Sequence, residues 1–246
     1  MTGVIVAAVL VVAAVGLSRA SRIGLERELV LAAVRAGVQL TVVGAIVALV
    51  FEHAGLAWAF VAVMLGAASL TSGRRLRGTP HATARAAAAI ALGAAAAIVP
   101  LLATGAFDTA PRELVPIAGI LIGGAMVATS VTGRRLIDRA EEDRAGVEAR
   151  LALGASVPEA LAPTVRQAVT TAMIPILDQT KNVGLVTLPG TFVGLILGGA
   201  TPAEAARVQL TVLLALLAVE LVAALAAARL TVAGLRAPGE RVVIRP

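Results

Sequence analysis

The chain has 246 residues, of which 59% are hydrophobic and 15% charged, and its mean hydropathy is +0.93. This composition excludes an ordinary soluble domain. The absence of cysteine excludes disulfides, thiolate metal sites and cysteine nucleophiles. The net charge of +6 would suit a nucleic acid, but the positions of the basic residues indicate membrane orientation instead, and we expect no nucleic-acid partner.

Seven apolar segments are each long enough to cross a membrane, for which about 20 helical residues suffice. We therefore predict an all-α, polytopic protein of the cell membrane with about seven transmembrane helices in contact with lipid. Its 24 glycines let helices approach closely in lipid, where packing drives association. The predicted spans are residues 2–17, 29–51, 54–70, 86–103, 114–132, 183–200 and 207–228.

The basic residues predict the orientation of these spans. With the N-terminus outside and the C-terminus cytoplasmic, 17 of the 21 basic residues fall in cytoplasmic segments, as the positive-inside rule requires. A cleaved signal peptide would place residue 21 outside and invert every later loop, so we predict that the first segment is retained as a span. The 17 residues are Arg19, Arg22, Arg27, Arg74, Arg75, Arg77, Arg85, Arg134, Arg135, Arg139, Arg144, Arg150, Arg166, Arg229, Arg236, Arg241 and Arg245.

Two nine-residue stretches, residues 68–76 and 128–136, resemble each other, and both end in Gly-Arg-Arg-Leu. One interpretation is an ancient duplication of helices. The other is that two helices end alike, with glycine past the end and arginine at the lipid–water boundary, and we favour it because few residues match.

The strongest interruption of the apolar pattern is residues 133–166, which carry six arginines and six acidic residues. Such a segment must lie in water, and we predict a cytoplasmic loop at about residues 133–168. It leads directly into the next apolar segment, so a force applied to the loop from the cytoplasm could be transmitted into the membrane.

Gly190, Gly194 and Gly198 recur every four residues and therefore form one stripe on the span predicted at residues 183–200. Such a stripe is typical of helix packing, either against another helix of the chain or across a dimer axis. Pro189 lacks a backbone N–H and should kink or break the helix just before the stripe. A broken helix is tolerated at membrane depth where it lines a cavity or is packed in protein.

The sequence contains no common catalytic motif. The P-loop, G-x-S-x-G, HExxH and CxxC patterns are absent, so we predict that the chain is not an enzyme and does not hydrolyse nucleotide itself. His53 and His81 lie far apart in loops without flanking ligands, and we expect neither a metal site nor a cofactor in this chain.

Several short motifs occur together in one order. Glu148-Ala149-Arg150, followed after three residues by Gly154, resembles the E-A-A-x-x-x-G loop of ABC-transporter permeases. With the other motifs it resembles the FetB-type permease family, which includes bacterial iron-export and plant aluminium-tolerance permeases. The resemblance covers roughly residues 28–225 and is strongest from 148 to 209. The other motifs are Arg35-x-x-x-Gln39-Leu40, Leu151-Ala152-Leu153-Gly154-Ala155-Ser156, Met173-Ile174-Pro175, and Gly184-Leu185-Val186-Thr187-Leu188-Pro189-Gly190 with Gly194.

This resemblance implies that residues 1–246 form a single transmembrane permease domain, which works as a homodimer with a separate ATPase subunit that binds ATP. A short cytoplasmic helix would dock into a cleft on that ATPase, and metal ions, iron first, would be exported. The chain offers no cysteine and two histidines, so weak oxygen ligation, a metal chelate or an organic anion fits its residues as well. The implied ATPase-coupling residues are Glu148, Ala149, Gly154, Ala155 and Ser156.

Polar residues within or beside the spans are the candidates for a translocation path. Those between 178 and 182 are either an interfacial cluster, with Asp178 paired to Lys181, or the inner mouth of the path. Arg35 and Glu220 lie about 9 and 12 Å from the inner ends of their spans. A lone charge is costly in hydrocarbon, so we predict a buried ion pair between these two residues. The path candidates are Arg35, Gln39, Asp178, Gln179, Lys181, Asn182 and Glu220.

Two other functions stay open on the sequence alone. One is a secondary transporter or channel that uses Arg35, Asp178 and Glu220 without ATP. The other is a non-transporting membrane scaffold for an ATPase. An ATPase encoded beside this chain would favour the ABC permease over the secondary transporter.

Overall fold

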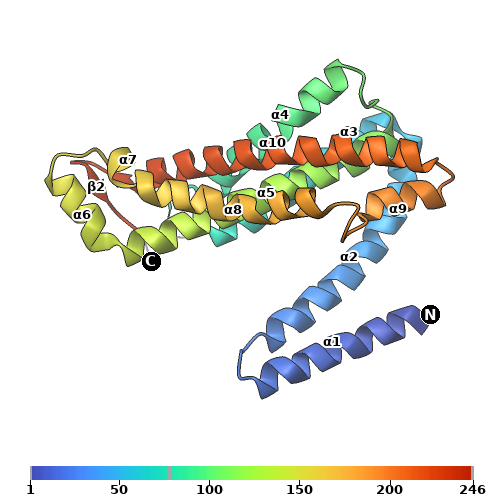
Figure 1. Ribbon diagram of the computed structural model, residues 1–246, viewed down its shortest axis with the longest axis horizontal. Helices are drawn as coiled ribbons and strands as arrows, with labels where there is room; N and C mark the ends of the chain where they lie inside the picture. The colour runs from blue at the N-terminus through green and yellow to red at the C-terminus, as the bar shows by residue number, and fades with distance from the viewer. Residues whose placement is uncertain (1, 77–78, 245–246) are drawn as a thin grey trace. The chain divides into compact units, whose positions relative to one another are not determined.

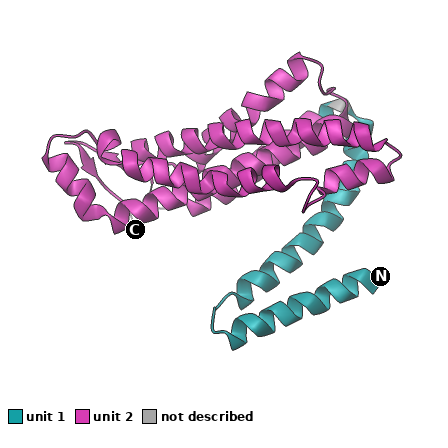
Figure 2. Ribbon diagram, viewed as in Figure 1, with its two compact units in different colours: residues 1–56 teal, residues 57–246 magenta. Residues whose placement is uncertain are grey.

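The computed structural model describes residues 2–76 and 79–244, and its contacts divide the chain into two compact units, Met1–Leu56 and Ala57–Pro246 (Figure 1, Figure 2). Almost every element is a helix, and the prediction of an all-α polytopic membrane protein is confirmed. The prediction of a single permease domain stays a prediction. Arg77 and Arg245, both in the predicted cytoplasmic set, lie outside the described residues.

The described elements run along the chain from a first helix near the N-terminus to a hairpin near the C-terminus. The helices are α1 (Thr2–Ala20), α2 (Glu26–Glu52), α3 (Ala54–Arg75), α4 (Ala82–Ala103), α5 (Pro111–Glu142), α6 (Arg144–Ala152), α7 (Val157–Ala160), α8 (Ala162–Asn182), α9 (Gly190–Leu197) and α10 (Pro202–Leu235). Two short strands, β1 (Arg236–Ala237) and β2 (Arg241–Val242), pair as an antiparallel hairpin.

Unit 1 consists mainly of α1 and α2, two apolar helices joined by a short turn. The turn is tight because Arg22 and Gly24 adopt left-handed backbone conformations, with φ of 54° and 81°. The Ser18 hydroxyl donates to the Glu26 carboxylate at 3.1 Å and accepts from the Leu25 N–H at 3.1 Å. These two bonds fix the end of α1 to the start of α2.

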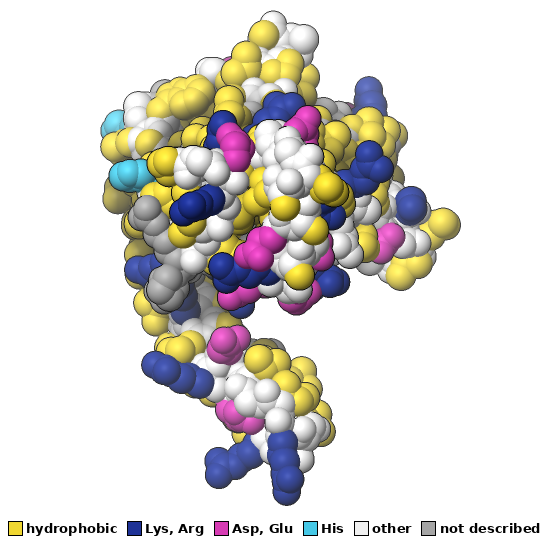
Figure 3. Space-filling model, turned by 90° about the vertical axis from the view of Figure 1, so that its left-hand side faces the viewer, with side chains coloured by type: hydrophobic (Ala, Val, Ile, Leu, Met, Phe, Trp, Pro, Cys, Tyr) yellow, Lys and Arg dark blue, Asp and Glu magenta, His cyan; other side chains and the backbone are white. Residues whose placement is uncertain are grey.

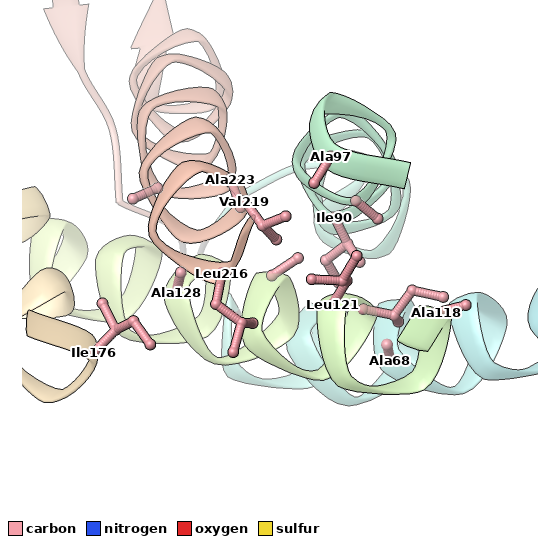
Figure 4. Packing of buried hydrophobic residues seen from close by; sticks show 14 of the residues in the cluster. Ala68, Ile90, Ala97, Ala118, Leu121, Ala128, Ile176, Leu216, Val219 and Ala223 are labelled. Carbon is pink, nitrogen blue, oxygen red and sulfur yellow. The ribbon is translucent and has the colours of Figure 1, made fainter. Parts of the chain in front are cut away.

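The central helix of unit 2 is α10, which packs along α4 and α5, while α8 packs against α5 and α10 (Figure 1). Leu216 and Val219 of α10 share one buried cluster with Ile90 of α4, Leu121 of α5 and Ile176 of α8 (Figure 4). Alanine supplies many of the remaining members of this cluster. The helix backbones therefore lie close together, as packing in lipid favours.

Glycines in α4 and α5 permit this close approach. A Cβ at Gly93 would lie 2.7 Å from the Ala223 Cβ and 2.9 Å from the Val219 carbonyl oxygen. A Cβ at Gly124 would lie 2.6 Å from Leu216 Cδ2. A side chain at Gly93 would therefore push α10 away from α4, whereas one at Gly124 would require the Leu216 side chain to shift.

The two similar stretches of the sequence pack against each other, one at the end of α3 and one within α5. The Ser72 hydroxyl lies 2.7 Å from the Ser130 hydroxyl and donates to the Met126 carbonyl oxygen at 3.2 Å. A Cβ at Gly133 would overlap Leu76. The resemblance between the stretches therefore includes small residues that this helix contact requires.

The span predicted at residues 183–200 is wrong as a single helix. In the part of the chain that the structure describes, six helices are long and apolar enough to cross a membrane. Residues 183–189 are not helical, and α9 has only 8 residues, about 12 Å of helix. Gly184 has φ of 81° and Pro189 has no N–H to donate, so the backbone leaves the helix despite its apolar composition. The break predicted at Pro189 is confirmed and begins at Val183.

Together, α8 and α9 run between the two ends of unit 2 (Figure 1). α8 starts at the end of unit 2 where α5 and α10 finish, and α9 leads to the opposite end, where α10 begins (Figure 1). The order of inner and outer segments predicted from the arginines requires that α8 and α9 cross the membrane together, and that order stays a prediction.

The charged segment predicted as a cytoplasmic loop, residues 133–168, is largely helical, and its position in the cytoplasm stays a prediction. α5 continues into it, α6 lies within it and α8 begins before it ends. Ion pairs one turn apart join Arg134 to Asp138 at 3.4 Å and Arg144 to Glu148 at 2.9 Å. Each such pair adds about 0.3–0.5 kcal/mol to a helix. The alternating charges therefore favour helix rather than loop.

Replacing Gly93 with alanine should destabilise unit 2 by about 1–3 kcal/mol, because the new methyl group meets a backbone carbonyl that cannot move aside. The matched control is Gly123→Ala in α5, since a Cβ there meets nothing within 4 Å. Thermal unfolding in detergent compares the two variants. Equal melting temperatures would contradict the close packing of α4 on α10.

Candidate functional site

The candidate coupling site is one end of unit 2, residues 143–161, which we call the tip. It contains α6 with Glu148 and Ala149, then a turn at Gly154 with φ of 95°. The Gly154 N–H donates to the Leu151 carbonyl oxygen at 3.0 Å, which ends α6 with a glycine cap. The turn itself therefore requires glycine here. That a small residue also lets a partner approach closely stays a prediction.

The turn presents an apolar side chain to solvent and then begins a new helix. Leu153 is 88% exposed, whereas the neighbouring Ala155 packs against the buried core of the tip. The Ser156 N–H and hydroxyl donate to the Glu159 carboxylate at 2.8 and 2.6 Å, which starts α7 with a capping box. Figure 3 views this end of unit 2, where basic, acidic and apolar side chains are interspersed.

The C-terminal segment, residues 236–244, which we call the tail, folds back onto the tip. β1 and β2 form its hairpin, with Gly239 in the turn at φ of 78°. The Glu240 carboxylate accepts a hydrogen bond from the Val157 N–H at 2.9 Å and forms an ion pair with Arg236. The start of α7 is thus bonded to a residue 83 positions away in the chain.

The tip has a hydrophobic core of its own, which we call the tip core. It joins α6 and α7 to the ends of α5, α8 and α10, and Val242 and Ile244 of the tail pack against it. Burying one large aliphatic side chain away from water is worth about 1.5–3 kcal/mol. A displacement of the tip must therefore move these helix ends or expose the core. The buried members are Leu136, Ala140, Val147, Val157, Ala160, Leu161, Ala168, Ala228, Val232 and Leu235.

The polar residues of α8 lie next to the break before α9. Asp178 is 12 residues beyond Arg166, about 18 Å along the helix from the tip end. The sequence placed these residues where a cytoplasmic helix becomes a span at residue 183, and their position at an inner mouth stays a prediction. The break continues directly from Asn182, whose carbonyl oxygen accepts from the Val186 N–H at 3.0 Å.

The alternative interpretation assumed an interfacial ion pair, which is not formed among the described residues. Among the described residues no ion pair joins Asp178 to Lys181. Both side chains are exposed, as are those of Gln179 and Asn182. If α8 crosses the membrane, four exposed polar residues on it require water or protein beside them. Their role in a path stays a prediction.

Glu220 is the buried carboxyl group of α10, with 8% of its surface exposed. Its Oε1 would lie 3.1 Å from a Cβ at Gly124, so the side chain faces α5. Within unit 2 as described, no ion pair involves Glu220. Arg35 and Gln39 belong to α2 of unit 1 and are exposed. The pair of Arg35 with Glu220 stays a prediction.

The glycine stripe has no partner helix among the described contacts. A Cβ at Gly190 or Gly194 would meet nothing within 4 Å, and one at Gly198 would meet only carbonyl oxygens of α9 itself. Leu197, beside the stripe, is 82% exposed. The interpretation of packing across a dimer axis therefore stays open, while packing within unit 2 has no support.

Two features of the site escaped prediction from the sequence. The first is the hairpin of the tail. The sequence analysis used only the arginines of the tail, although its Pro238-Gly239 pair is typical of a turn. The tip core was hidden because its members are scattered over six segments of the chain. In residues 2–76 and 79–244, no group of three or more His, Cys, Asp or Glu side chains could hold a metal ion.

Lowering the pH should loosen α7. The hydrogen bonds from Ser156 hold the pKa of Glu159 below its ordinary value of 4.5. The ionised carboxylate therefore stabilises α7 fully above pH 4.5. This stabilisation is lost as the pH falls through the lower pKa that Glu159 has in the folded protein. Because the chain has no cysteine, a spin label on Pro158→Cys reports α7 alone, and its mobility should rise below pH 4.5.

The control for this titration is the same label in Glu159→Gln. The glutamine keeps an acceptor oxygen at every pH, so its label should show a smaller rise. Identical pH profiles in the two proteins would mean that Glu159 does not hold α7.

Comparisons with known proteins place the chain in a family. A family profile described as "Uncharacterised protein family (UPF0014)" matches residues 1–235. No solved structure gives a significant match. The chain is 40% identical over 211 residues to "UPF0014 membrane protein STAR2" of Oryza sativa subsp. japonica, covering 85% of this chain and 74% of that protein.

Two further relatives carry functional names. The chain is 36% identical over 209 residues to "Protein ALUMINUM SENSITIVE 3" of Arabidopsis thaliana, covering 84% of this chain and 77% of the relative. It is 31% identical over 227 residues to "Probable iron export permease protein FetB" of Escherichia coli (strain K12), covering 92% and 88%. The predicted relationship to FetB-type permeases is confirmed, and the chain belongs to the UPF0014 family of multi-pass membrane proteins.

Proposed function

We propose that this chain is the membrane permease of an ABC transporter, in which two copies work with two copies of a separate ATPase. The observation that carries the proposal is the tip. Its exposed Leu153, held by the Gly154 turn, offers a partner an apolar contact, and the tip core links that contact to α5, α8 and α10. An ATPase that moves the tip would therefore move three membrane helices.

The proposed orientation places the tip in the cytoplasm, where ATP is available. Support comes from the arginines, since Arg85, Arg166, Arg229 and Arg236 belong to the tip end of unit 2, while Arg112 and Arg207 begin α5 and α10 at the other end. Positive charge on one side favours that side as the inner one. The N-terminus is then outside and the C-terminus is cytoplasmic in the cell membrane.

The break between α8 and α9 supports the proposed homodimer and a path beside the break. Leu185 and Val186 in the break are 89% and 78% exposed. Non-helical backbone at membrane depth does not face lipid, so it must be covered by protein or line a water-filled cavity. A second copy meeting the glycine stripe of α9 would cover one side, and the polar turn from Asp178 to Asn182 would line the other.

The proposed cargo is a metal ion or a metal chelate, with iron first. The name of the Escherichia coli relative includes iron export, and that of the Arabidopsis relative includes aluminium sensitivity. This chain has no cysteine and only two histidines, so its own ligands for a metal in transit would be oxygen atoms, which bind hard cations and suit brief contact. Export would proceed by alternating access.

Transport into inverted membrane vesicles tests the whole proposal. Vesicles that contain the permease and its ATPase should accumulate a metal or metal chelate only when ATP is supplied. Permease reconstituted without any ATPase should not transport. Transport by the permease alone would establish a secondary transporter or channel, and ATPase binding without transport of any cargo would establish a scaffold.

Leu153→Gln should weaken capture of the ATPase by at least about tenfold, because it removes the apolar contact at the tip while leaving the buried core unchanged. Leu92→Gln is the matched control. Leu92 is 56% exposed in the middle of α4 and belongs neither to the tip nor to the glycine stripe. Pull-down of the ATPase on immobilised permease measures the difference. Equal capture by both variants would place the docking contact elsewhere.

A charge swap tests the proposed pair in the path. Glu220→Gln should reduce transport or folding, because breaking a buried pair typically costs about 3–5 kcal/mol through the stranded charge. The double variant Arg35→Glu with Glu220→Arg should recover part of that loss in a vesicle transport assay. If the single changes are harmless, or the swap is no better than the worse of them, the two residues are not partners.

A further inference from the structure

The tail begins where the family profile ends, at residue 235, yet it has a defined structure. Its hairpin pairs Arg236 with Val242 and Ala237 with Arg241. The Val243 N–H donates to the Leu235 carbonyl oxygen at 2.8 Å, which ties the returning strand to the end of α10. The tail is therefore an ordered extension of α10 that turns back onto the tip.

One polar contact links the tail to the start of α7. Val157 is the first residue of α7, and its N–H has no acceptor within that helix, as is general at a helix N-terminus. The Glu240 carboxylate accepts this N–H at 2.9 Å and also forms an ion pair with Arg236. A carboxylate at a helix N-terminus is favoured by the positive end of the peptide dipoles.

Apolar contacts and a groove extend the same junction. Val242 and Ile244 pack against the tip core. Between the tail and α6 lies a groove of about 420 Å³, whose walls include Glu148 of the coupling motif on one side and Arg241 on the other. The tail therefore supplies one wall of the surface that carries Glu148.

α7 depends on such contacts because it has only four residues. A helix this short is unstable on its own, so its position is set by the groups that hold its ends and its buried face. The capping box fixes Ser156 to Glu159 within the tip, and Val157 and Ala160 are buried in the tip core. The bond from Val157 to Glu240 comes from outside the tip.

We infer that the tail is a brace that positions the tip for the ATPase, with Glu240 as the positioning residue. The inference rests on the proposed function for the nature of the partner, whereas the brace is a property of the permease alone. Without the brace, α7 and the turn at Gly154 lose a fixed position relative to α10, and motion of the tip is transmitted less completely to the bundle.

The first arm of the test uses the permease without ATPase. Hydrogen exchange of the Val157 amide should be about tenfold faster in Glu240→Ala, which removes the acceptor. Glu240→Gln keeps an acceptor oxygen and should exchange nearly as slowly as the unmodified protein. Arg236→Gln removes only the ion-pair partner and is the matched control. Unchanged exchange in Glu240→Ala would overturn the brace. If that variant does not fold, Glu240→Asp, whose shorter side chain withdraws the carboxylate, replaces it.

The second arm measures ATP hydrolysis by the ATPase that the unmodified permease captures. Glu240→Ala should reduce permease-dependent stimulation by about fivefold or more, with an unchanged melting temperature of the permease, and Glu240→Gln should restore most of it. If the Val157 amide exchanges faster in Glu240→Ala but stimulation of ATP hydrolysis is complete, Glu240 does not position the tip for the ATPase. Failure of the proposed function is distinguishable, because Leu153→Gln would then also leave capture and stimulation unaffected.

Discussion

The close approach of α10 to α4 and α5 is the constraint on which unit 2 depends. Lipid chains are as apolar as leucine, so these helices are not driven together by the hydrophobic effect and must associate through contact. Gly93 and Gly124 provide that contact by allowing α10 to meet helix backbones directly. Once α10 is fixed in this way, its far end at Leu235 defines where the tip core can form, since Leu235 is one of its buried members.

α8 connects the two parts of the candidate site. Its first turns contribute Ala168 to the tip core, its middle contributes Ile176 to the central cluster, and its last turn carries Asp178 and Asn182 beside the break (Figure 1). A helix of 21 residues is about 30 Å long. In the proposed transporter, α8 would carry a movement of the tip to the residues from Asp178 to Asn182, whereas the non-helical residues 183–189 would leave α9 free to stay in place.

Much of this architecture follows from the sequence. The length of the apolar segments predicts the spans, and the positions of the arginines predict their orientation. Hydropathy fails at residues 183–200, where the composition is as apolar as a span but Gly184 and Pro189 impose a non-helical backbone. Hydropathy cannot detect a change of backbone conformation. Hydropathy also did not indicate that α8 belongs to the helix bundle. Its polar residues lower its mean hydropathy, although it packs on α5 and α10.

At residues 133–168, charge predicted a segment in water but did not show how much of that segment is helical. A dense alternation of signs suggests a solvated loop, but pairs such as Arg144 with Glu148 lie one turn apart and stabilise a helix. The motif Glu148-Ala149-Arg150 was recognisable and lies on α6, and its role in coupling stays a prediction. The bond between Val157 and Glu240 could not be predicted, because it joins residues 83 positions apart and depends on the hairpin that follows α10.

The two clusters of unit 2 are stabilised by different interactions. A change that weakens one cluster therefore need not weaken the other. The central cluster lies among spanning helices, where close packing dominates and the solution has little access. The tip core lies beyond them, where apolar burial from water, capping by Glu159 and the bond from Glu240 contribute. In the proposed transporter, a partner, a change of pH or a change in the tail would therefore loosen or tighten the tip while the bundle keeps its packing. Since both clusters share α5, α8 and α10, such a change would reach the membrane as a movement of intact helices rather than as unfolding.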